Sequence, residues 1–131
     1  HFFGAKGMIG LRVMWKNEIL HEWSLAIMHG SGGGTVENMF KGMKQNWEAD
    51  AYFCSHLHQK KIQPEIVYAF DWRTGRVYQK DIILVNTGSF QEPITNDVDG
   101  YMDRKNSIIA TGVGTSTVEF NGYDGSMKGH L

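Results

Sequence analysis

Two long apolar segments, separated by a short polar one, lie near the start of the chain. Residues 8–15, MIGLRVMW, and residues 19–28, ILHEWSLAIM, flank the polar residues Lys16, Asn17 and Glu18. This pattern predicts two strands joined by a turn. The second segment becomes continuously apolar toward its end, which is typical of a strand that is buried on both faces of a sheet.

A glycine-rich loop and an amphipathic helix are predicted next. The loop is HGSGGGT, residues 29–35, and its last residue, Thr35, is a suitable helix N-cap. Apolar residues then recur at helical spacing and form one stripe: Val36, Met39, Phe40, Met43 and Trp47. Residues 51–55, AYFCS, predict a second short buried strand. Strand, helix and strand in this order predict a βαβ unit in a parallel or mixed sheet.

The rest of the chain predicts more strands. Residues 65–71, EIVYAFD, alternate as a strand does, and a turn around Gly75 leads into a strand at residues 77–85 that ends in NTGSF. Two further strands are expected at residues 107–113 and 115–120. The last residues, 121–131, have the composition of a frayed end. The expected fold class is α/β, in one domain over residues 1–131.

Composition and charge narrow the classes of function. The 131 residues are 41% hydrophobic and 21% charged, as in a globular domain with a hydrophobic core, and the net charge of −1 gives no support for broad binding to nucleic acids or membrane surfaces. The single cysteine, Cys54, excludes an intrachain disulfide, and no apolar run has the length of a membrane span. We expect a cytoplasmic protein that does not bind membranes. The abrupt start at His1, without an initiator Met, suggests a piece of a longer protein.

Three of the six histidines follow the two strands of the predicted βαβ unit. His29 ends the first strand, and His56 and His58 end the second. Because the carboxyl ends of parallel strands meet at one edge of a sheet, we expect these histidines to gather there. Residues two apart in an extended chain point to the same side, so His56 and His58 would hold one metal ion together or one ion each. Imidazole suits zinc, manganese, iron, cobalt and nickel. The alternative is that one of the pair only caps a strand end.

The glycine-rich loop is the second candidate for chemistry. Gly30, Gly32 and Gly33 would let the backbone approach a bound anion closely. A plain tight turn between strand and helix explains the same residues equally well. Lys60 and Lys61 follow the histidine pair and would either steer an anion or form a solvated turn. Cys54 is expected to be a buried structural thiol.

The order of three segments resembles the second half of the calcineurin-like metallophosphoesterases, and most of all the phage and bacterial members. The segments are IMHGSGGG, then ADAYFCSHLHQK after a helix, then ILVNTGSF. They contain His29-Gly30, residues 55–58 (SHLH) in place of the family's G-H-x-H motif, and residues 86–89 (NTGS) as an Asn-x-Gly-Ser segment. The resemblance covers roughly residues 3 to 120. It implies the C-terminal half of an αββα sandwich with mixed β-sheets, either as a single domain or as a fragment.

The resemblance also implies a reaction and a set of ligands. His29 and His56 would bind one metal of a two-metal centre, and His58 would bind the other. The backbone of the glycine-rich loop, with Gly30, Gly32 and Gly33, would approach the phosphate. The metals would be Mn, Zn, Fe, Ni or Mg, and they would activate a water that attacks a phosphoester. The substrate class is open between small molecules, nucleotides and nucleic acids, acted on by a phosphatase or a phosphodiesterase. No residue of this chain is assigned as catalytic. The compartment implied is the cytoplasm of a bacterium or of a phage-infected host cell.

The chain departs from the family at two points. Position 55 is Ser where the family has Gly. The family's D-x-H, G-D-x-x-D and G-N-H motifs, which supply two acidic ligands, an Asn ligand and the His that assists the leaving group, are not found in the 131 residues. We therefore expect the enzyme to have a further N-terminal half. The alternative is a non-catalytic structural or interaction module that retains the metallophosphoesterase fold and binds one zinc ion. The candidate protein partners are the missing N-terminal half and a second copy of this chain. A third possibility is a domain that binds a small anion through the glycine-rich loop.

Overall fold

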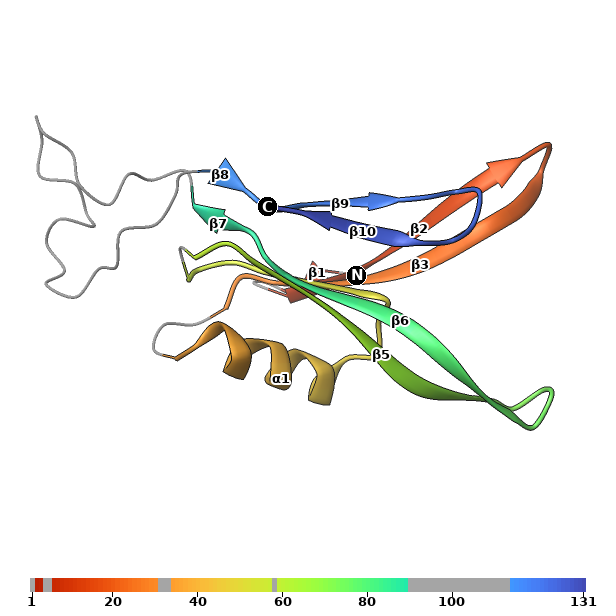
Figure 1. Cartoon of the computed structure of the whole chain (residues 1–131), viewed down its shortest axis with the longest axis horizontal. Coiled ribbons are helices and arrows are strands. Elements are labelled where there is room, and N and C mark those ends of the chain that lie inside the picture. Colours follow the sequence, from red (N-terminus) through yellow and green to blue (C-terminus); the bar gives the residue numbers. More distant parts are fainter. Residues whose placement is uncertain (1, 4–5, 31–33, 58, 90–113) are drawn as a thin grey trace, which may run out of the picture.

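The computed structural model describes residues 2–3, 6–30, 34–57, 59–89 and 114–131. Its main element is a six-stranded sheet of order β1-β2-β3-β4-β6-β5 (Figure 1). The strands are β1 (Phe2–Phe3), β2 (Lys6–Trp15), β3 (Glu18–Met28), β4 (Ala51–Cys54), β5 (Lys61–Asp71) and β6 (Arg76–Asn86). Neighbours β3, β4 and β6 run parallel, whereas β2 and β5 pair antiparallel with β3 and β6. The protein is thus a mixed α/β structure built mostly of strands, with the mixed sheet that the sequence predicts.

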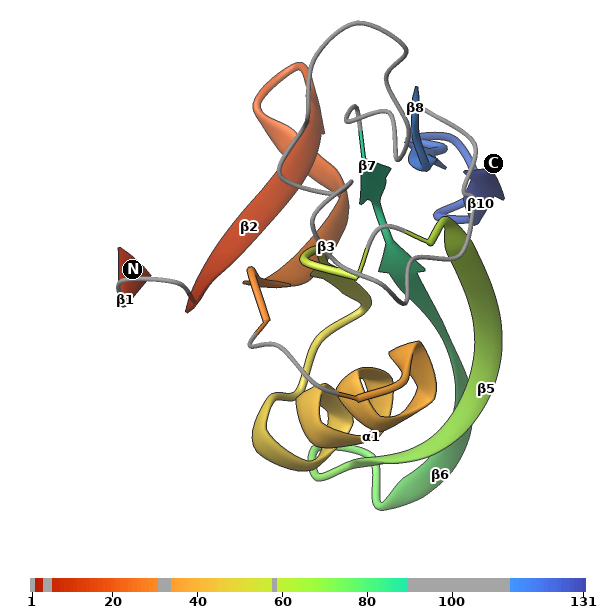
Figure 2. The same cartoon turned by 90° about the vertical axis from the view of Figure 1, so that its left-hand side faces the viewer.

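The predicted βαβ unit is present as β3, α1 (Val36–Asn46) and β4. Thr35 caps α1, because its hydroxyl accepts a hydrogen bond from the backbone N–H of Asn38 at 3.3 Å. The apolar stripe of α1 packs on one face of the sheet, where it joins a buried cluster: Ala26, Val36, Phe40, Met43, Ala49, Tyr52, Cys54, Ile82 and Leu84. The turned view in Figure 2 shows β5 and β6 curving around this helix. No helix in the described part of the chain has the length and apolarity needed to cross a membrane.

A hairpin of β9 (Thr117–Phe120) and β10 (Met127–His130) lies on the other side of the sheet from α1 (Figure 1). Its half-buried apolar side chains pack on a second buried cluster of Ala51, Ile83 and Val85. The expectation of a frayed end at residues 121–131 is therefore wrong. The segment is polar and glycine-rich, but Met127 and the close approach of Gly129 to Ile62 hold it against the sheet. These are tertiary contacts, which the pattern of the segment's own residues does not predict.

The predicted strands elsewhere need smaller corrections. The strand expected at 65–71 begins four residues earlier, at Lys61, and includes Pro64, which is tolerated because β5 is an edge strand. The strand expected at 115–120 is divided into β8 (Gly114–Thr115) and β9, and β8 pairs with β7 (Gly88–Ser89). The strand expected at 107–113 lies outside the described residues.

Candidate metal centre

The carboxyl ends of β3, β4 and β6 lie side by side in the sheet. Met28 pairs with Cys54, and Cys54 pairs with Asn86, so the residues that follow each strand begin at one edge. His29 and His56 accordingly come together, with ring centroids 5.4 Å apart and ring planes at 78°. Both side chains are exposed. The structure thus unites two of the three predicted ligands, while the third, His58, lies outside the described residues.

The backbone at this edge is shaped by two residues with positive φ. Gly30 has φ +87°, and a Cβ there would lie 3.1 Å from the carbonyl oxygen of Ser55 and 2.6 Å from the side chain of Met39. Glycine is thus required for the loop after β3 to approach the loop after β4. His56 has φ +83°, a conformation that is costly for a residue with a Cβ and that is found more often at functional sites than elsewhere. Gly32 and Gly33 lie outside the described residues, so their predicted contact with phosphate remains a prediction.

Asn86 fixes the loop that carries His56. Its side chain is fully buried, and its amide group donates to the carbonyl oxygens of Leu57, at 2.6 Å, and Gln59. Its Oδ1 atom accepts from the thiol of Cys54 at 3.5 Å. Ser116 in turn donates its hydroxyl to the backbone oxygen of Asn86 at 3.2 Å. The end of β6 is therefore tied both to the histidine loop and to the chain segment before β9.

The single thiol belongs to the core. Cys54 is 1% exposed, and burial raises its pKa to about 12. A thiol with such a pKa remains protonated at neutral pH in the metal-free protein and is therefore a poor nucleophile. The prediction of a buried structural thiol is confirmed.

The lysines that follow the histidine pair have separate roles. Lys61 belongs to β5, where its ammonium group pairs with Glu37 of α1, and this hydrogen bond is the main reason that the pKa of Glu37 falls to about 2. The prediction of a solvated turn is thus wrong for Lys61. The side chain of Lys60 passes close to Gly88, where an added Cβ would lie 2.5 Å from the Cγ of Lys60. Gly88 also has φ +84°, and an added Cβ would lie 3.0 Å from the backbone oxygen of Gly114, so that position of β7 favours glycine.

The donor set of the described residues fits part of a metal site. Two imidazoles at this separation are suitable nitrogen ligands for one transition-metal ion. In the described part of the chain, no group of three or more His, Cys, Asp and Glu side chains is placed to hold a metal ion. Two dications close together repel each other strongly without an anionic bridge. A two-metal centre at this edge of the sheet would thus need further ligands, namely His58 and carboxylates that are not among the described residues at this edge.

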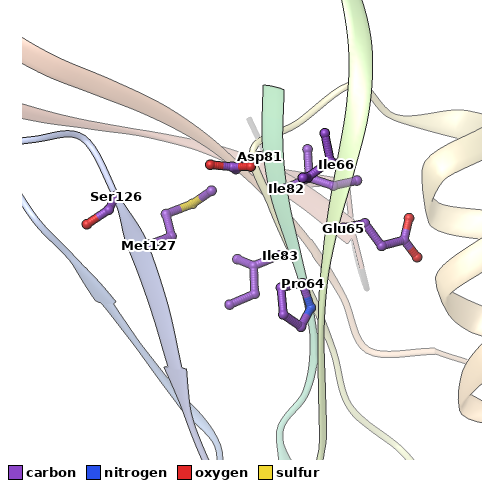
Figure 3. Close-up of a pocket in the computed structure, with 8 residues that line it drawn as sticks. All are labelled: Pro64, Glu65, Ile66, Asp81, Ile82, Ile83, Ser126 and Met127. Carbon is purple, nitrogen blue, oxygen red and sulfur yellow. The ribbon is translucent and has the colours of Figure 1, made fainter. Parts of the chain in front are cut away.

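A separate cavity lies away from the histidines. It has a volume of about 570 Å³ between the middle of β5 and β6 and the start of β10 (Figure 3). Its walls are mainly apolar, from Pro64, Ile66, Ile83 and Met127, and its two acidic residues are Glu65 and Asp81. Figure 3 shows Glu65 directed toward the helix, where its carboxylate pairs with Lys44 of α1 at 2.5 Å. We assign no chemistry to this cavity.

Comparison with known proteins adds no identification. Neither family models, curated protein sequences nor solved structures give a match to this chain.

Sequence reasoning located His29 and His56 but missed Ser55 as a partner of the site. The Ser55 hydroxyl lies 2.9 Å from Nδ1 of His29. Both residues stand at ends of adjacent parallel strands, so their proximity followed from the predicted topology. The hydrogen bond itself depends on two side-chain rotamers, which the sequence does not specify.

Proposed function

We propose that this chain forms the histidine side of a two-metal centre that hydrolyses phosphoesters. The observation that carries the proposal is the meeting of His29 and His56 at the adjoining carboxyl ends of β3 and β4. The resemblance of residues 29–30, 55–58 and 86–89 to metallophosphoesterase motifs supports it. In this proposal the six-stranded sheet is one layer of an αββα sandwich, and the acidic ligands come from chain outside these 131 residues.

Each residue has a role in the proposal. His29 and His56 hold one metal ion and His58 holds the second, while Gly30 keeps the two loops close and Asn86 holds the His56 loop in place. The bound metals, of the kinds that imidazole and carboxylate accept, would supply a water of lowered pKa and neutralise charge on the phosphoryl oxygens. The phosphoester would be a small molecule, a nucleotide or a nucleic acid.

The proposal is tested with the complete natural protein that contains this chain. His29→Ala and His56→Ala should lower its bound metal, measured by atomic emission, and reduce hydrolysis of bis(p-nitrophenyl) phosphate by more than about 100-fold. Circular dichroism should remain unchanged, because both side chains are exposed.

A matched control is His130→Ala. His130 is exposed on β10, where its Nε2 lies 3.5 Å from a carboxylate oxygen of Glu119, and it contributes nothing to the proposed centre. It should retain metal content and turnover. Full metal content and turnover in both His29→Ala and His56→Ala would exclude the proposed centre.

A second candidate is a non-catalytic module that binds one zinc ion. It is favoured by the limited donor set, since within the described part of the chain only two imidazoles meet and no carboxylate joins them. Metal analysis separates the two candidates. About two metals per chain with turnover supports the hydrolase, whereas one zinc without turnover supports the module.

A further inference from the structure

The hydroxyl of Ser55 touches His29 at two places. Its Oγ lies 2.9 Å from Nδ1 of the His29 ring and 3.3 Å from the backbone oxygen of the same residue. Ser55 reaches this position because it follows β4, next to the end of β3, where its own N–H donates to the Met28 oxygen at 3.3 Å. The two residues are 26 positions apart in sequence, so only the parallel pairing of β3 and β4 brings them together.

The two contacts together favour one position for the proton of the His29 ring. The backbone oxygen of His29 can only accept a hydrogen bond, and the hydroxyl has one hydrogen to donate. If that hydrogen goes to the backbone oxygen, the hydroxyl accepts from Nδ1, and both contacts are hydrogen bonds. If it goes to Nδ1 instead, two oxygen atoms face each other at 3.3 Å without a hydrogen between them. The first arrangement satisfies both contacts, and it requires the proton on Nδ1.

We propose that Ser55 is a positioning residue that holds neutral His29 in the Nδ1–H tautomer and so presents the lone pair of Nε2 to a metal ion. This inference rests on the proposed metal centre and assigns a role to a residue that departs from the family motif. Metal-ligating histidines commonly donate their second ring N–H to an oxygen, which fixes the tautomer and orients the ring. The same hydrogen bond restricts rotation of the exposed His29 ring.

The first test reads the tautomer directly and needs no metal. Long-range ¹H–¹⁵N spectra of the metal-free protein at about pH 8.5, where ordinary imidazole is neutral, distinguish a protonated ring nitrogen from an unprotonated one. We expect Nδ1–H at His29 in the natural protein. Ser55→Ala should shift His29 toward Nε2–H, the tautomer that free imidazole side chains prefer, and Ser55→Thr, which retains the hydroxyl, should keep Nδ1–H.

The second test reads metal affinity by titration with Zn²⁺. Ser55→Ala should weaken binding by about 10–100-fold, as loss of an outer hydrogen-bond partner does, and Ser55→Thr should restore most of it. The matched control is Ser24→Ala. Ser24 lies on β3, the strand that His29 follows. Its hydroxyl donates to Asp50 at 2.7 Å and not to His29. Ser24→Ala should change neither the tautomer of His29 nor the affinity for zinc.

The outcomes separate this inference from the proposed function. An Nε2–H tautomer in the natural protein, a tautomer that Ser55→Ala leaves unchanged, or full zinc affinity in Ser55→Ala overturns the role of Ser55. A tautomer that responds to Ser55→Ala in a protein that binds no metal at all overturns the metal centre instead. In that case the hydrogen-bond assignment for His29 still stands.

Discussion

Asp50 shows at the residue scale how a charged side chain is held beside the core. One carboxylate oxygen pairs with the Lys80 ammonium at 2.8 Å, and the other accepts from the backbone N–H and the hydroxyl of Ser24 at 2.6 and 2.7 Å. Burial disfavours the charged carboxylate, but the hydrogen bonds from Lys80 and Ser24 outweigh it and lower the pKa of Asp50. The network links β3 to β6 through the residue that precedes β4.

Removing this charge should destabilise the fold. Asp50→Asn keeps the side chain's shape but loses the ion pair and leaves the partly buried Lys80 without its counter-charge, so we expect the free energy of unfolding to fall by about 1–2 kcal/mol at pH 7. Urea unfolding followed by tryptophan fluorescence measures it. Glu22→Gln breaks the exposed pair of Arg12 and Glu22, whose side chains are 64% and 52% exposed, and should cost less than about 1 kcal/mol. Equal losses in the two variants would contradict this account.

At the scale of elements, the β9–β10 hairpin is held to the sheet through its turn. The indole N–H of Trp23 donates to the backbone oxygen of Gly125 at 3.2 Å, and the turn approaches the ring of His21. Gly125 has φ +76°, and a Cβ there would lie 2.7 Å from Nδ1 of His21. Glycine is thus needed both for the turn and for its packing on β3.

Gly125→Ala should therefore loosen the hairpin. We expect it to lower the free energy of unfolding by about 2–3 kcal/mol, as backbone strain and a clash with His21 combine. Gly75→Ala is the control, since Gly75 has a similar φ of +68° but nothing within 4 Å of its added Cβ. Gly75→Ala should lower the free energy of unfolding by about 1 kcal/mol, because it adds only backbone strain. If both variants lost the same stability in urea, the packing of the turn on β3 would contribute nothing.

The elements that the sequence predicted are those with a strong local pattern. The stripe of α1 has a helical period, and the end of β3 and all of β4 are apolar runs typical of buried strands. The order of these elements indicated that His29 and His56 would meet. The segment at 127–130 could not be predicted in this way, because it forms a strand through contacts with β9 and the distant sheet. The start of β5 was missed for a related reason, since Pro64 disfavours a strand unless its position at an edge is known.

Carboxylates with lowered pKa values are spread over the whole molecule. Besides Asp50, hydrogen bonds from Lys44 to Glu65, from Thr74 to Asp71 and from Ser126 to Asp124 lower the pKa of each acceptor. They lie on β5, at the β5–β6 turn and at the β9–β10 turn. A carboxyl group whose pKa is lower in the folded than in the unfolded state stabilises the fold above its unfolded pKa.

Stability of the whole protein should therefore fall in acid. We expect a nearly constant urea midpoint from about pH 7 to about pH 5, and a progressive decrease below about pH 4 as these carboxylates take up protons. Asp50→Asn should have a flatter profile over the acidic range than the natural protein, because one of the responsible groups has been removed. A midpoint that stays constant down to pH 3 would contradict this assignment.

The parallel pairing of β3 with β4 also has a kinetic consequence. His29 and His56 are brought together by a crossover through α1, so they are far apart in any chain in which that crossover has not docked. Two segments that are distant in sequence lose chain entropy when the loop between them closes, and this cost comes before their contacts form. Such pairings are therefore slow to form. The two imidazoles therefore come within reach of each other only after β3 and β4 have paired, and a metal ion that binds both would report this pairing during refolding.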